Sequence, residues 1–131
     1  MKILVPVRYP LGENSISTLK RAVEIADERD ASLIVLHIDL FQDSKRVETS
    51  DLRREVESKM GKIDAHYSVR EGFLVEESIL QEAASRDTDM IVIGRTQTGR
   101  WRRALRRMIG NSPDIERFLR ERLEAEIHVV S

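Results

Sequence analysis

Alternation of short β-strand-like segments with helical segments constrains this chain more than any other feature of its sequence. The strand-like segments are residues 3–7, 32–38, 64–69, 90–93 and 127–130. The first intervening helix shows the apolar spacing of one helix face, at Ile16, Leu19, Val23 and Ala26. Strands that alternate with helices predict a parallel sheet covered on both faces, and right-handed crossovers make it doubly wound.

Capping and turn residues mark where the helices are expected to begin. Asn14 or Ser15 is predicted to cap the first helix, and Ser50 to cap the second. Glu71-Gly72 predicts a turn ahead of a third helix, whose acidic first turn suits the positive end of the helix dipole. Two further helices are expected over residues 101–108 and 113–123.

Composition narrows the class of protein. The chain has 131 residues, 40% of them hydrophobic, which suits one domain over residues 1–131. It contains no cysteine, which excludes disulfides, thiolate metal sites and a cysteine nucleophile. The histidines lie in different predicted strands, so no metal site is expected. No apolar run reaches the length of a membrane span, and no cleavage signal follows the start, so we expect a cytoplasmic protein with no membrane partner.

The loop after the fourth predicted strand is the first place to look for a ligand. The apolar run 90–93 stops at Gly94, and a polar loop containing Gly99 follows. In doubly wound sheets, ligands bind beyond the carboxyl ends of the strands. Residues 110–113 then begin another helix, and the unsatisfied backbone N–H groups of a helix start favour anions. The sequence therefore predicts a small phosphate-bearing ligand in this region.

An arginine-rich stretch follows the same loop. Its members are Arg95, Arg100, Arg102, Arg103, Arg106 and Arg107. Arginines four residues apart repel one another on a helix, so acidic groups of the fold, an acidic partner or a polyanion should compensate. Nucleic acid is the weaker interpretation, because the net charge is −1 and only Trp101 adds an aromatic ring nearby. An acidic protein partner at residues 100–107, or a small phosphate ligand, is favoured instead.

A pattern carried by residues 3–7, 14–26, 33–38, 89–94 and 127–130 resembles the universal stress protein family over nearly the whole chain. No single segment is specific, but their order and spacing together are. The resemblance implies a single α/β domain with a Rossmann-like, five-stranded parallel sheet in the order 3-2-1-4-5 and helices on both faces. It also implies a stress-response or signalling role.

The family resemblance further implies a binding fold without an established reaction. Many members bind ATP through Gly-x2-Gly-x9-Gly-[Ser/Thr] after the fourth strand, with an aspartate just after the first strand. Here Gly94 matches the first glycine, Gln97 stands at the second, and Gly110 lies three residues beyond the third. Arg8 stands in the position of the aspartate and cannot accept a hydrogen bond. We therefore expect weaker ATP binding than in members with the full motif, and a preference for polyphosphate over nucleoside.

The candidate ligand contacts are Val7, Arg8, Gly94, Arg95, Thr96, Thr98, Gly99, Asn111 and Ser112. Backbone amides of residues 94–99 and 111–112 would hold the phosphates of ATP or another adenine nucleotide, and the main chain of Val7 would meet the base. Arg8 and Gly94 are expected to face one cavity. The sequence marks no catalytic group. Two alternatives stay open: a family member that works through protein–protein contacts without a nucleotide, and a nucleotide hydrolase.

The last predicted strand indicates a homodimer. As the final strand it should lie at a sheet edge, and an exposed apolar edge tends to acquire a partner. Ile127, Val129 and Val130 are therefore expected at an interface between two copies, which pair antiparallel about a two-fold axis.

Overall fold

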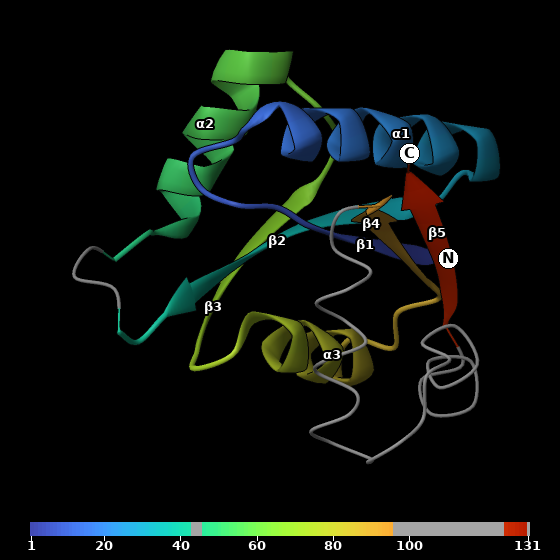
Figure 1. The fold of residues 1–131 in the computed structure, drawn as a ribbon. Coiled ribbons are helices and arrows are strands. Elements are labelled where there is room, and N and C mark those ends of the chain that lie inside the picture. The colour runs from blue at the N-terminus through green and yellow to red at the C-terminus, as the bar shows by residue number, and fades with distance from the viewer. Residues whose placement is uncertain (43–45, 96–124, 131) are drawn as a thin grey trace.

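The computed structural model describes residues 1–42, 46–95 and 125–130. Five strands form one sheet in the order β3-β2-β1-β4-β5, and each pair of neighbours is parallel (Figure 1). The strands are β1 (Lys2–Pro6), β2 (Ser32–Leu40), β3 (His66–Gly72), β4 (Met90–Gly94) and β5 (Glu126–Val130). The predicted strand order and parallel pairing are confirmed.

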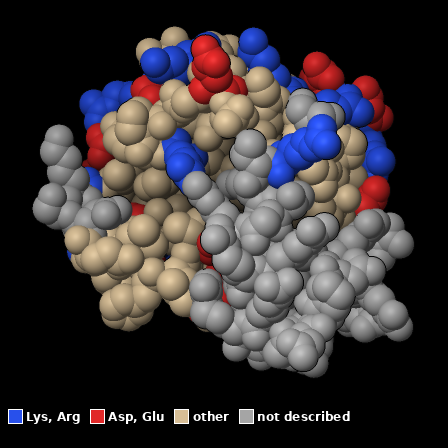
Figure 2. Space-filling view, in the orientation of Figure 1, with Lys and Arg blue, Asp and Glu red and all other residues tan. Residues whose placement is uncertain are grey.

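Helices cover both faces of this sheet, as predicted. α1 (Glu13–Arg29) and α2 (Thr49–Met60) lie on one face, and α3 (Val75–Ser85) lies on the other (Figure 1). Basic and acidic side chains mix over the outer side of α1 and α2 (Figure 2). In the described part of the chain, no helix is long and apolar enough to cross a membrane. The helices expected over residues 101–108 and 113–123 lie outside the described residues.

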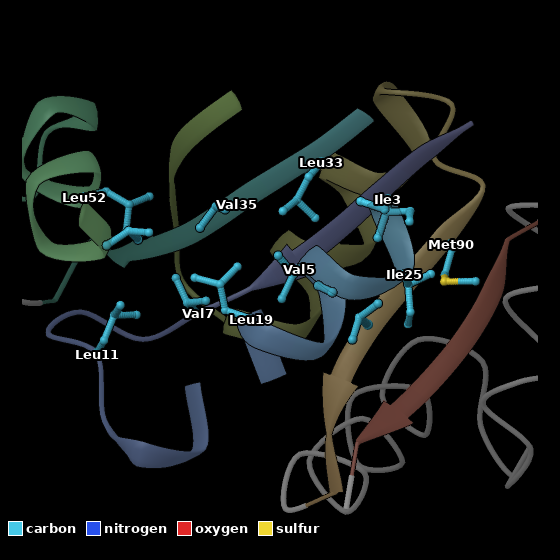
Figure 3. Close-up of a cluster of buried hydrophobic side chains, with 14 residues drawn as sticks. Ile3, Val5, Val7, Leu11, Leu19, Ile25, Leu33, Val35, Leu52 and Met90 are labelled. Carbon is cyan, nitrogen blue, oxygen red and sulfur yellow. The ribbon is translucent and has the colours of Figure 1, made fainter. Parts of the chain in front are cut away.

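Two apolar clusters hold these layers together. Strand side chains alternate between the faces, so Ile3 and Val5 join the cluster under α1 and α2, while Leu4 joins the one under α3. Figure 3 shows the first cluster, in which Leu19 of α1 and Leu52 of α2 point toward the sheet. Strand residues Ile3, Leu4 and Val5 are 0% exposed, as a parallel strand covered on both faces requires.

The predicted helix caps were wrong in their positions. α1 begins earlier, with Gly12 as its N-cap, and the Ser15 hydroxyl instead accepts a hydrogen bond from the Arg8 amide at 3.3 Å. α2 begins at Thr49 with Glu48 as its N-cap, and the Glu48 amide donates to the Asp51 carboxylate at 2.9 Å. The side chains of Glu48 and Asp51 thus cap each other's backbone amides, and Ser50 is not the cap.

The predicted turn at Glu71-Gly72 was also wrong, because both residues end β3. Their pairing with β2 continues as far as Leu40 opposite Gly72, and the Gly72 carbonyl accepts from the Phe41 amide at 3.0 Å. A Cβ atom at Gly72 would collide with the hydroxyl of Ser78 on α3. The glycine therefore allows close packing of the strand end against the helix, rather than a reversal of the chain.

A cluster of ion pairs joins α3 to β3. The carboxylate of Glu82 accepts from Arg70 at 2.9 Å and from Arg86 at 2.6 Å, and Arg86 also donates to the Ser68 hydroxyl at 3.1 Å. Burial raises the pKa of the Glu82 carboxyl, but the hydrogen bonds and charges of the two arginines outweigh burial and lower it below its ordinary value. The ionised form of Glu82 is thus the one that stabilises the fold.

Truncating Leu19 tests the core of the larger cluster. Leu19→Ala should lower the free energy of unfolding by about 3 kcal/mol, because it removes a fully buried side chain and leaves a cavity. Urea unfolding followed by circular dichroism measures the change. Lys20→Ala, at the next and exposed position of α1, should stay within about 0.5 kcal/mol of the parent. A loss below 1 kcal/mol for Leu19→Ala would contradict the packing.

The pH dependence of stability tests the Glu82 cluster. A carboxyl with a lowered pKa stabilises the fold above its unfolded-state pKa, and this contribution is lost as pH falls through its folded-state pKa. Glu82→Gln should therefore cost about 1 kcal/mol at pH 7, and the gap from the parent should close below about pH 4. Urea unfolding over pH 3–7 measures it, with the exposed Glu24→Gln as control. A gap independent of pH would refute the role of the charge.

Candidate functional site

A cavity of about 500 Å³ opens at the carboxyl ends of β1 and β2, beside the N-terminal end of α3. Its apolar wall comes from strand ends and the first turns of α3, chiefly Ile38, Leu40, Val75 and Ile79. The volume falls within the range of pockets that enclose small organic ligands. The cavity therefore lies at the edge of the sheet where parallel strands present their functional groups.

Two opposite charges line this cavity at different depths. Arg8 directly follows β1 and is exposed, whereas Glu76 in the first turn of α3 is only 9% exposed. Within the described residues, no acidic group pairs with the Arg8 guanidinium, and no donor reaches the Glu76 carboxylate. The cavity thus offers a cation at its opening and an anion in its interior.

Main-chain hydrogen bonds fix the wall that carries Arg8. The Val7 amide donates to the Leu36 carbonyl at 2.8 Å, which extends the contact between β1 and β2 beyond Pro6. Further along, the buried Leu11 donates its amide to the Glu55 carboxylate of α2 at 2.7 Å. The segment between these anchors, including Arg8, is therefore held across the end of the sheet.

His37 and Tyr9 form the polar and aromatic part of the same wall. The Nδ1 atom of His37 lies 3.1 Å from the Val7 carbonyl oxygen, which can only accept, so Nδ1 carries the hydrogen. In the neutral ring Nε2 is then an acceptor. The Tyr9 ring lies 6.0 Å from the His37 ring, centroid to centroid, at a tilt of 56°. Both rings line the cavity.

Exposed aromatic side chains form the opposite rim. Phe73 is 71% exposed and lies 4.6 Å from Phe41, centroid to centroid. The Gln42 side-chain amide donates to the Phe73 carbonyl at 3.3 Å and ties the two loops together. Figure 2 shows mostly uncharged surface at the lower left, over the end of β3 and the start of α3. Phe73 therefore offers an open ring face beside the cavity.

The position of Glu76 on α3 explains its burial. It precedes Ile79 by three residues and Ala83 by seven, so it shares the face of α3 that packs on the sheet. At the start of the helix this face meets the cavity instead of the core. The N-cap residue of α3, Leu74, makes no side-chain capping hydrogen bond. The side chain of this residue therefore leaves the first backbone N–H groups of α3 uncapped.

The predicted site residues are only partly brought together. Val7 and Arg8 line the cavity. Gly94 ends β4 and Arg95 follows it, on the strand next to β1, but neither is among the described residues that line the cavity. The shared cavity expected for Arg8 and Gly94 stays a prediction, because the loop that follows Arg95 lies outside the described residues. The remaining candidates lie outside the described part of the chain: Thr96, Thr98, Gly99, Asn111 and Ser112.

Sequence reasoning missed His37, Phe73 and Glu76. We interpreted Glu76 only as an acid that complements the helix dipole. Its spacing from Ile79 and Ala83 placed a carboxylate on an apolar helix face, and that pattern could have marked it. His37 interrupts the apolar run of β2 close to its carboxyl end, and that break in the run is the signal available for this residue. Phe73 belongs to no sequence pattern that would have indicated a binding site.

The chemistry that this cavity supports is recognition. Its groups can stack on a flat ring, accept from donors at Glu76 and donate to anionic oxygens from Arg8. Among the residues that the structure describes, no group of three His, Asp or Glu side chains is placed to hold a metal ion. The arrangement fits a ligand with distinct polar ends and an apolar or aromatic middle.

Several solved structures with the same fold are universal stress proteins. UspA from Lactobacillus plantarum superposes with a TM-score of 0.63 at 18% identity, covering 100% of this chain and 97% of that one. One from Archaeoglobus fulgidus gives 0.55 at 18% identity, covering 100% and 98%. A universal stress protein in complex with cAMP gives 0.57 at 18% identity, covering 98% and 96%.

Sequence comparison identifies the family directly. No curated protein sequence gives a significant match to this chain. The model of the universal stress protein family matches residues 1–114, which include β1 to β4. This match spans most of the chain and agrees with the sheet order. The chain therefore belongs to the universal stress protein family.

Proposed function

We propose that this chain is a homodimeric universal stress protein that binds a small phosphate-bearing ligand in a stress-response or signalling role. The observation that carries the proposal is the cavity at the carboxyl ends of β1 and β2, lined by the exposed guanidinium of Arg8, which has no acidic partner among the described residues. A guanidinium presents five N–H donors in a planar fork that matches phosphate oxygens. The cytoplasmic location that we propose accords with a sequence free of cysteine.

Adenine nucleotides, ATP first, are the ligands that the family resemblance implies. A relative of the same fold binds cAMP, which is also an adenine nucleotide. The backbone amides of residues 94–99 and 111–112 remain the proposed phosphate contacts, together with Arg95. The Val7 amide is already used in the sheet and its carbonyl already accepts from His37, so one carbonyl lone pair is left for a base.

Removing the charge of Arg8 tests the proposal. Arg8→Gln should weaken binding of ATP and of tripolyphosphate about tenfold, because charge-assisted hydrogen bonds to phosphate are lost. Binding of the parent protein should weaken with added salt, and that of Arg8→Gln less so. Calorimetric titration at 50 and 300 mM salt measures both. Arg54→Gln, whose arginine is exposed on α2 away from the cavity, should bind like the parent.

The same titration separates the alternatives. Adenosine bound tightly and independently of salt would contradict a site built around phosphate. If ATP, tripolyphosphate and adenosine all fail to bind, the chain acts through protein–protein contacts without a nucleotide. If ATP binds and ADP accumulates over hours, the hydrolase alternative holds.

The homodimer is proposed through β5, which lies at the edge of the described sheet. Ile127 and Val130 pack partly against the two apolar clusters of their own chain. Val129 is 44% exposed and is therefore the apolar side chain of this strand most available to a partner. Two copies of this edge, paired antiparallel about a two-fold axis, would extend the sheet. An acidic protein partner at residues 100–107 remains a separate prediction.

A charge at the proposed interface tests the dimer. Val129→Lys should give a monomer in sedimentation velocity, because two lysines would face each other about the two-fold axis in a dry contact. His66→Lys places the same charge on β3 at the opposite edge of the described sheet and should leave the dimer intact. A dimer unchanged by Val129→Lys would remove β5 from the interface.

A further inference from the structure

We propose that the cavity selects a guanine nucleotide: its base pairs with the buried carboxylate of Glu76, and its phosphates lie at Arg8. This inference rests on the proposed function, since it names the ligand of the same cavity. The recognition chemistry is a pair of neighbouring N–H donors at one end of the ligand and anionic oxygens at the other.

The buried carboxylate carries the inference. Glu76 lines the cavity, is 9% exposed, and receives no hydrogen bond or ion pair from the described residues. A carboxylate in such a mostly enclosed position binds N–H donors more strongly than one in open water, because fewer water molecules compete for its oxygens. The other acids buried to this degree do have donors: Asp39 accepts from the Val47 amide at 3.0 Å, and Glu82 accepts from two arginines. Glu76 is therefore placed to receive donors from a ligand.

The positions of the charges fix the orientation of that ligand. Glu76 and Glu77 make the first turn of α3 acidic, and their charges oppose the attraction of this helix start for phosphate. Arg8 lies on the other wall, exposed and unpaired within the described residues. Phosphates therefore belong at the opening beside Arg8, and the donor-rich end belongs in the interior beside Glu76.

Hydrogen-bond complementarity then distinguishes the bases. The Watson–Crick edge of guanine presents two adjacent donors, N1–H and the N2 amino group, which match the two oxygens of one carboxylate. The same edge of adenine presents one donor, the N6 amino group, beside the N1 acceptor. If adenine bound in the same way, the lone pair of its N1 atom would face a carboxylate oxygen, and the two would repel each other. Sites that pair buried polar groups reject mismatched ligands strongly, because the mismatch leaves those groups unsatisfied.

The walls suit a flat base rather than a small cation. The cavity volume of about 500 Å³ exceeds what an amino acid side chain fills. Apolar groups of α3 and the open ring of Phe73 offer surfaces for stacking. Free arginine also pairs a guanidinium with a carboxylate, but it leaves these surfaces without contact, so it serves as the competing probe.

Replacing the carboxylate of Glu76 with a carboxamide tests whether the cavity selects guanine. In the parent protein, GDP should bind about tenfold or more tightly than ADP in calorimetric titration. Glu76→Gln should reverse this order, because a carboxamide presents one donor and one acceptor and so matches adenine. Glu13→Gln is the matched control: it also alters a glutamate in the first turn of a helix, but an exposed one away from the cavity, and should keep the parent preference.

Thermal unfolding without ligand gives a second measurement. Glu76→Gln should unfold at a higher temperature than the parent, because it removes a buried charge that lacks donors. GDP should raise the unfolding temperature of the parent more than ADP does. A lower unfolding temperature for ligand-free Glu76→Gln would mean that the carboxylate stabilises the fold itself, and the inference would be overturned.

Three further outcomes would overturn the inference in different ways. Equal binding of GDP and ADP in the parent would refute guanine selection and leave the proposed function standing. Binding of arginine without GDP would mean that the carboxylate serves a guanidinium ligand. Failure of GDP, ADP and tripolyphosphate alike to bind would overturn the proposed function, and the inference with it.

Discussion

Burial of the central strands on both faces is the constraint on which the rest of this structure depends. β1 and β4 are packed with apolar side chains on both faces, so these two strands leave no room for a polar group or a ligand on either face. Functional groups must therefore emerge where the strands end. Arg8 follows β1, and His37 lies near the end of β2, so both meet the cavity for the same topological reason.

The sequence allowed the architecture to be predicted well, because strand order follows from robust patterns. These patterns are the apolar runs, such as 90–93, and the helical spacing of Leu19 and Val23. They reflect only which side chains face the core, and in the structure these side chains do face it. The wrong predictions concern groups whose partners lie in the neighbouring element or loop, outside the turn to which the group was assigned. Gly72 looked like a turn residue, but its role is set by the close approach of Ser78 from α3. Ser15 looked like a cap, but its hydroxyl serves the Arg8 amide.

The candidate site was less predictable than the fold for a physical reason. Arg8 and Val7 could be placed from the position of β1 and from the family pattern, and both line the cavity. Glu76 was missed, because an acid in a first helical turn has an ordinary electrostatic explanation and its place on the apolar helix face was not weighed against it. The packing of α3 shows that Glu76 is mostly buried and lines the cavity. The packing of α3, rather than residue type, decides which acid of its first turn lines the cavity.

The two charges of the cavity also differ in how solvent acts on them. The guanidinium of Arg8 is exposed, so mobile ions weaken its attraction for an anion. Glu76 is mostly buried, so solvent and mobile ions weaken its interactions less. The proposed site would thus attract an anion in a salt-dependent way at Arg8, and would select its ligand at Glu76 with little dependence on salt.

The anchoring of α3 gives the cavity a further property. Glu82 and Arg86 bind this helix to β3, whereas the wall that carries Arg8 is attached to β2 and α2 through Leu36 and Glu55. The width of the cavity therefore depends on two walls that are attached to different strands and helices. Neither Glu55 nor Glu82 lines the cavity. A substitution at either residue would nevertheless reach the cavity, through the wall that the residue anchors.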